Sequence, residues 1–103
     1  MKKYIPVKPN ERGYTHVKIE TYYNKGNTPE KRGYYISVFP VTRDEKHGVP
    51  MESFEVFSGS VFQMLTVSRK SEKSERIAEE RAEKIENYFL STVCTKNRLE
   101  VLP

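Results

Sequence analysis

The spacing of apolar residues along the chain changes once, at Ser71. In residues 13–68 apolar and polar positions largely alternate, which is the period of a β-strand. In residues 71–96 apolar positions recur every three or four residues, which is the period of an amphipathic helix. The sequence therefore predicts an α+β domain in which an antiparallel meander of about four strands is covered on one face by one long C-terminal helix.

Four segments carry the strand pattern, and loops rich in Gly, Pro, Asn and charged residues separate them. They are residues 14–23, 34–39, 51–58 and 61–67. Gly59 either separates the last two or forms a bulge inside one long strand, and both possibilities stay open. The segment 61–67 is apolar on both of its faces, which predicts a central or covered strand.

The two ends of the chain are predicted from proline and capping residues. Residues 1–12 are expected to form an extended N-terminal arm, because Pro6 and Pro9 cannot donate to a central ladder. The first strand is then expected to begin after Gly13. Residues 97–103 are expected to form a short edge strand or a packed tail. With 103 residues, the chain is expected to be a single domain, residues 1–103.

The helix has a predicted start, a predicted end and a predicted buried stripe. Ser71 suits the N-cap, and Asn97 is expected to end the helix in the left-handed conformation. Only Arg81 crosses the stripe, and its aliphatic stem can cover apolar surface. The apolar members of the stripe are Ile77, Ala78, Ala82, Ile85, Tyr88, Phe89 and Val93.

Leu90 and Cys94 project from the charged side of this stripe, four residues apart. One interpretation is a contact with a protein partner, including a second copy of this chain in a homodimer. The other is cover by the C-terminal tail.

Composition and motifs exclude several classes. Cys94 is the only cysteine, so an internal disulfide and a multi-cysteine zinc site are excluded. The near-neutral bases are His16 and His47, and neither has a second ligand at metal-binding spacing. No Gly-rich phosphate loop or nucleophile motif is present. We therefore predict no catalytic residues, no cofactor and no metal, and hence no enzymatic activity.

Location is predicted from the same sequence. No run of about 18 apolar residues exists to span a membrane, and prolines interrupt any signal-peptide core near the N-terminus. The sequence therefore predicts a cytoplasmic protein without a membrane partner.

The formal net charge of +4 is unevenly distributed. Residues 1–70 carry 12 Lys or Arg against 7 Asp or Glu, whereas residues 71–96 carry 5 against 6. Such a basic excess on strands and loops attracts a phosphate backbone or an acidic protein groove, although it also serves solubility alone. The candidate partner-binding residues are the loop cations Lys25, Lys31, Arg32, Arg43 and Lys46.

Tyrosines on the strands add a nucleic-acid alternative. Tyrosine rings stack on bases while neighbouring cations hold phosphates. The opposing interpretation is that these rings are ordinary half-buried strand residues. The candidate rings are Tyr14, Tyr22, Tyr34 and Tyr35, and the candidate phosphate-holding cations are Lys18, Lys25, Lys31, Arg32 and Arg43.

The chain is short and lysine-rich, and it opens with Met1-Lys2-Lys3-Tyr4-Ile5-Pro6-Val7-Lys8-Pro9. In size and style it resembles small accessory proteins of phages and conjugative elements, among them anti-CRISPR proteins. This resemblance implies an inhibitor that occupies the DNA-binding or nuclease surface of a CRISPR effector, or otherwise disables it. We therefore predict a non-enzymatic macromolecule-binding protein with a protein or nucleoprotein partner. Direct nucleic-acid binding is the alternative.

Overall fold

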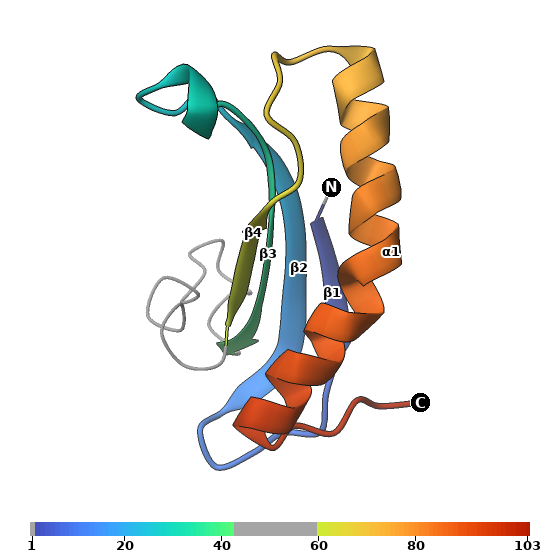
Figure 1. The fold of residues 1–103 in the computed structure, drawn as a ribbon. Helices are drawn as coiled ribbons and strands as arrows, with labels where there is room; N and C mark the ends of the chain where they lie inside the picture. Colours follow the sequence, from blue (N-terminus) through green and yellow to red (C-terminus); the bar gives the residue numbers. More distant parts are fainter. Residues whose placement is uncertain (1, 43–59) are drawn as a thin grey trace.

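The computed structural model describes residues 2–42 and 60–103. Within them, four antiparallel strands lie in the order β1-β2-β3-β4, and one helix packs against one face of the sheet (Figure 1). This confirms the predicted α+β class with its meander and long C-terminal helix. The elements are β1 (Lys2–Pro6), β2 (Tyr14–Asn24), the 3-10 helix η1 (Pro29–Lys31), β3 (Gly33–Thr42), β4 (Val61–Met64) and α1 (Glu72–Asn97).

The hairpin of β2 and β3 forms the centre of the sheet and supplies half of the core. Ile19 pairs with Val38, and Thr21 pairs with Ile36. The side chains of Ile19, Ile36 and Val38 face α1 and are completely buried. Alternation along both strands therefore places one apolar face under the helix, as the sequence pattern predicts.

The start of α1 and most of its buried stripe are confirmed. The Ser71 hydroxyl accepts a hydrogen bond from the Ser74 backbone N–H at 3.1 Å, as an N-cap does. The Arg81 guanidinium crosses the stripe and donates to the Leu65 carbonyl oxygen. The buried apolar residues of the helix are Ala78, Ala82, Phe89 and Val93.

Two helix predictions are wrong. Tyr88 is 71% exposed, because the stripe passes through Phe89 and leaves position 88 on its flank. The left-handed residue is Arg98, with φ of 54°, and not Asn97. Asn97 stays helical because its side chain is buried and donates to the Val93 carbonyl oxygen at 3.0 Å.

The N-terminal arm contains a strand, so the prediction that the first strand begins after Gly13 is wrong. β1 pairs with β2, with Lys3 opposite Ile19 and Ile5 opposite Val17. An edge strand needs a ladder on one side only, so a proline is tolerated at its end, as Pro6 is here.

β4 also differs from its prediction. Phe62 is 58% exposed and Gln63 is exposed as well, so the prediction that this strand is covered on both faces is wrong. Among the described strands, β4 pairs with β3 alone. The predicted strand 61–67 is shorter than expected, because β4 ends at Met64. Leu65 follows it, is buried, and donates its N–H to the Tyr34 carbonyl oxygen at 2.8 Å. The predicted strand 51–58 and the question about Gly59 lie outside the described residues.

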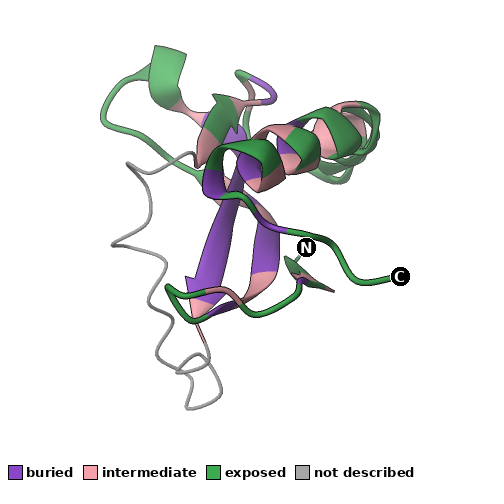
Figure 2. Ribbon diagram, turned by 90° about the horizontal axis from the view of Figure 1, so that it is seen from below, coloured by how far each residue is buried: buried purple, intermediate pink, exposed green. Residues whose placement is uncertain are grey.

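The C-terminal tail folds back on the end of the helix. Leu99 is buried and donates its N–H to the Cys94 carbonyl oxygen at 2.8 Å, while Val101 forms an isolated bridge with Val7. Leu90 and Cys94 are half-buried and pack against the core. Figure 2 shows the buried residues where the strands and the inner side of the helix meet.

Candidate binding surface

The connection between β2 and β3, residues 25–32, carries three of the five predicted contact cations. We call it the basic loop. Lys25 and Lys31 are exposed and Arg32 is half-buried, while Glu30 supplies one opposing charge. Arg43 and Lys46, the other two predicted contacts, lie outside the described residues.

The basic loop is held by local hydrogen bonds. The Asn24 side-chain oxygen accepts from the Gly26 N–H at 2.9 Å. The Lys31 N–H donates to the Thr28 carbonyl oxygen at 3.0 Å, which closes the single turn η1. The loop therefore presents its cations from a defined backbone.

Three rings form a stack across the sheet face opposite α1. We call Tyr22, Tyr35 and Phe62 the aromatic ladder; they come from β2, β3 and β4 in turn. The ring centroids of Tyr22 and Tyr35 are 6.0 Å apart, and those of Tyr35 and Phe62 are 5.3 Å apart, with interplanar angles of 22° and 18°. Tyr35 is buried between its neighbours, whereas Phe62 on β4 is exposed.

The aromatic ladder and the basic loop are physically joined. The Tyr35 hydroxyl donates to the Lys31 carbonyl oxygen. At the first ring of the ladder, burial raises the pKa of the Tyr22 phenol, and the Glu20 carboxylate raises it further. The two features therefore form one surface, with cations at the loop and an exposed ring on β4.

A hollow of about 350 Å³ lies beside the aromatic ladder. Phe39, Tyr22 and Phe62 supply aromatic walls, and Glu20 and Ser37 supply polar groups. A hollow with this lining suits an apolar or planar group of a partner.

The base-stacking prediction is wrong for three of its four tyrosines. Tyr14 and Tyr34 are 3% and 5% exposed, because they lie in the core between the sheet and the helix. Tyr35 has neighbours stacked on both of its faces. Among the described residues, Tyr22 and Phe62 at the two ends of the ladder each have one stacked neighbour within it.

Lys18 is also unsuited to holding a phosphate, because it is 1% exposed. Its ammonium nitrogen is 3.3 Å from a Glu20 carboxylate oxygen and 5.6 Å from the centroid of the Phe39 ring. The Lys18 ammonium group therefore interacts with Glu20 and Phe39 on its own sheet face and does not reach a phosphate.

His16 and Cys94 were considered as chemical groups, and both have contacts typical of structural residues. His16 is half-buried, shares a 2.9 Å hydrogen bond with the Thr15 hydroxyl and meets the Tyr4 ring edge to face. Burial raises the pKa of the Cys94 thiol, which disfavours the nucleophilic thiolate. His47 lies outside the described residues. Across residues 2–42 and 60–103, no group of three or more metal-ligating side chains converges, and no helix is long and apolar enough to cross a membrane.

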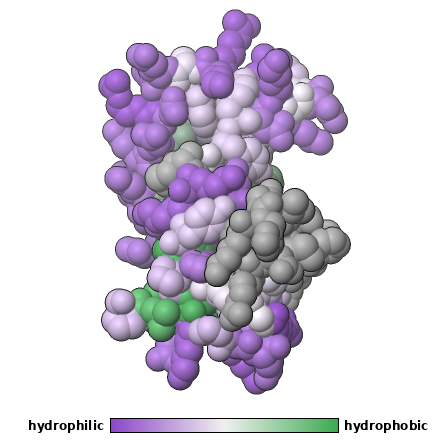
Figure 3. All heavy atoms as spheres, turned by 180° about the vertical axis from the view of Figure 1, so that it is seen from behind, coloured by the Kyte–Doolittle hydropathy of each residue, from purple (hydrophilic) through white to green (hydrophobic). Residues whose placement is uncertain are grey.

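Sequence reasoning missed Phe62 as a surface residue. Its exposure depends on the tertiary packing around β4, and the stacking of its ring depends on strand register, which no local pattern encodes. Figure 3 shows one face of the molecule, on which, outside the atoms drawn in grey, hydrophilic side chains predominate.

No protein-family model, curated protein or solved structure matches this chain.

Proposed function

We propose that this is a non-enzymatic binding protein that contacts a protein or nucleoprotein partner through the basic loop and the aromatic ladder. The observation that carries the proposal is the junction at Tyr35. Its ring stacks between Tyr22 and Phe62 while its hydroxyl holds the Lys31 carbonyl oxygen, so exposed cations and an exposed ring lie on one surface.

This combination has the composition of a protein interface. Aromatic side chains and Arg are enriched where binding energy concentrates, and cations speed encounter with an acidic or phosphate-bearing surface. Tyr35 is held on both faces and through its hydroxyl, so little side-chain entropy remains to be lost there on binding.

An inhibitory role fits the same surface. In this role the protein disables a host nucleoprotein such as a CRISPR effector, as the resemblance to small mobile-element proteins implies. Loop cations such as Lys31 would contact phosphates of the bound nucleic acid, and Phe62 would contact the protein component.

Direct binding of nucleic acid is the second candidate. The observation in its favour is the exposed Phe62 ring on a surface that also carries Lys25 and Lys31. A base stacked on Phe62 with phosphates along the loop is the arrangement that single-strand-binding proteins use.

Affinity capture from bacterial lysate, with and without nuclease, separates the two candidates. The tagged full chain is the bait, and bound proteins are identified by mass spectrometry. We expect a specific protein partner to be captured, either directly or as part of a nuclease-resistant complex. Loss of all binding after nuclease treatment would instead establish direct nucleic-acid binding.

Salt dependence provides the matching control. Binding carried mainly by phosphate contacts weakens steeply as salt rises, for any nucleic acid of similar length. We expect the captured partner to stay bound between 50 and about 200 mM salt, a range over which a protein with many phosphate contacts loses most of its affinity.

A further inference from the structure

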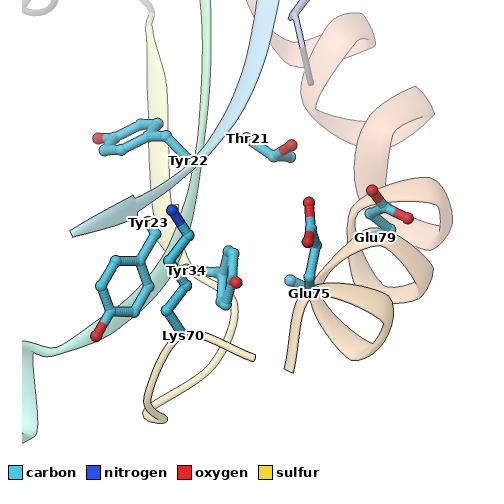
Figure 4. A pocket seen from close by; sticks show the side chains of 8 residues that line it. Thr21, Tyr22, Tyr23, Tyr34, Lys70, Glu75 and Glu79 are labelled. Atoms are coloured by element: carbon cyan, nitrogen blue, oxygen red, sulfur yellow. The ribbon is translucent and has the colours of Figure 1, made fainter. Parts of the chain in front are cut away.

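The two ends of the molecule differ in the balance of their charges. At the end that carries the basic loop, a hollow between the sheet and the first turns of α1 is lined by Lys70, Glu75 and Glu79 (Figure 4). At the opposite end, the connection between β1 and β2 lies beside the C-terminal end of α1 (Figure 1). A hollow of about 650 Å³ lies there, which we call the arginine hollow. Its lining residues are Asn10, Glu11, Arg12, Lys96, Asn97 and Arg98.

The lining of the arginine hollow is cationic. Arg12, Lys96 and Arg98 contribute three positive charges, and Glu11 contributes one negative charge, which leaves a net charge of +2. All four side chains are exposed. Among the described residues, neither Lys96 nor Arg98 has a carboxylate oxygen within 4.0 Å. These two cations are therefore available to an anion that arrives from solvent.

Local hydrogen bonds define the backbone on both sides of the arginine hollow. The Asn10 side-chain oxygen accepts from the N–H groups of Arg12 and Tyr14 at 3.1 and 3.2 Å. On the helix side, the Arg98 N–H donates to the Thr95 carbonyl oxygen at 3.3 Å. These bonds use backbone N–H groups, so replacing the lining cations leaves them in place.

The C-terminal end of a helix carries partial negative charge on its unsatisfied carbonyl groups, which opposes an anion. In α1 this charge is reduced by local partners. The Val93 carbonyl oxygen accepts from the Asn97 side chain at 3.0 Å, and the Cys94 carbonyl oxygen accepts from the Leu99 N–H at 2.8 Å. The cations of the arginine hollow therefore dominate the field at this end.

The exposed side of α1 changes its character toward the arginine hollow. From Glu72 to Lys84 every exposed residue of the helix is charged, whereas from Asn87 to Thr95 the exposed residues are uncharged. Tyr88, on the uncharged part, is 71% exposed. An exposed aromatic ring in surroundings depleted of charge is typical of a contact surface.

A hollow of about 250 Å³ runs along the uncharged part of α1 and adjoins the arginine hollow, because Lys96 lines both. Its other lining residues are Tyr88, Ser91, Thr92 and Thr95. Tyr88 and Lys96 are eight residues apart, which is about 12 Å along a helix. Three to four stacked nucleotides cover about this length.

We propose that the arginine hollow and the adjoining face of α1 bind a short stretch of single-stranded nucleic acid. Lys96 and Arg98 hold phosphate oxygens, and a base stacks on Tyr88. A single strand fits better than a duplex, because its unpaired bases leave their faces open to an aromatic ring. This inference rests on the proposed function, and it assigns the nucleic acid of a nucleoprotein partner to the end opposite the basic loop.

The test is an NMR titration of the isolated full chain with a thymidine tetranucleotide, which is too short to reach from this end to the basic loop. We expect saturable shifts in the amide signals of Tyr88, Thr95 and Arg98. The double variant Lys96→Gln/Arg98→Gln should weaken binding at least about fivefold, because two phosphate contacts are lost. Tyr88→Leu should also weaken binding at least about fivefold, because the stacked base is lost.

Lys73→Gln/Arg76→Gln is the matched control, because it removes the same charge at exposed positions near the start of the same helix. It should leave the affinity for the tetranucleotide unchanged. An abasic tetranucleotide tests the stacking, since Tyr88→Leu should not alter its binding. Absence of saturable shifts at this end, equal weakening by the two double variants, or an unchanged affinity of Tyr88→Leu for the thymidine probe would overturn the proposal. The titration needs no partner, so its failure is distinguishable from a failed capture experiment.

Discussion

At the scale of single residues, close approaches between segments decide which side chains the fold accepts. The backbone of residues 65–66 crosses directly over the start of β3, where it bonds to Tyr34. At Gly33, an added Cβ would lie 1.8 Å from the Thr66 carbonyl oxygen. Gly33 is therefore required for the chain to leave β4 along this path.

We expect Gly33→Ala to lower the free energy of unfolding by about 3 kcal/mol, because backbone has to move to admit the methyl group. Gly13→Ala is the matched control: Gly13 has φ of 83°, but an added Cβ there meets nothing within 4 Å. Backbone conformation alone should cost that variant about 1 kcal/mol. Urea denaturation measures both, and equal losses would refute the role given to the crossing segment.

The environments of single side chains are also the features that the sequence predicted least well. Tyr34 and Tyr35 are adjacent, yet one faces the helix and the other stacks in the aromatic ladder. The alternation predicts opposite faces, but it does not say which face the helix covers, nor that Lys18 on the other face is buried. Those outcomes depend on tertiary packing and strand register.

At the scale of elements, the helix follows from local sequence, whereas β1 and β4 do not. α1 begins at Glu72 after the predicted cap because capping, charge and apolar spacing all agree there. β1 and β4 are 5 and 4 residues long, too short for alternation to be distinctive, and each is stabilised by a longer neighbour. Such segments become strands through pairing and not through their own pattern.

The N-cap gives a test at this scale. Ser71→Ala removes the acceptor for the Ser74 N–H and also the 2.6 Å contact between the two hydroxyls. We expect it to lower the free energy of unfolding by about 1 kcal/mol. Ser91→Ala, on the exposed side of the same helix, should be neutral or slightly stabilising. Thermal denaturation by circular dichroism compares them, and a Ser71→Ala variant as stable as the wild type would contradict the capping role.

At the scale of the whole molecule, the basic loop lies at one end of a body measuring 41 × 26 × 21 Å, and the start of α1 lies at the same end (Figure 1). A partner that covers this end would meet cations on the loop and the carboxylates of Glu72 and Glu75 in the first turn of the helix. Such a mixed pattern of charge specifies orientation better than a uniform basic face does.

The most direct test of this account is the double charge reversal Lys31→Glu/Arg32→Glu, measured as retention of the captured partner. Its control is Lys8→Glu/Lys84→Glu, which makes the same change in net charge at two exposed positions outside the basic loop. We expect the loop variant to retain at least about tenfold less of the captured partner at an unchanged melting temperature, whereas the control variant retains the partner as the wild type does. Equal retention by both variants would contradict the assignment of the binding surface to the basic loop.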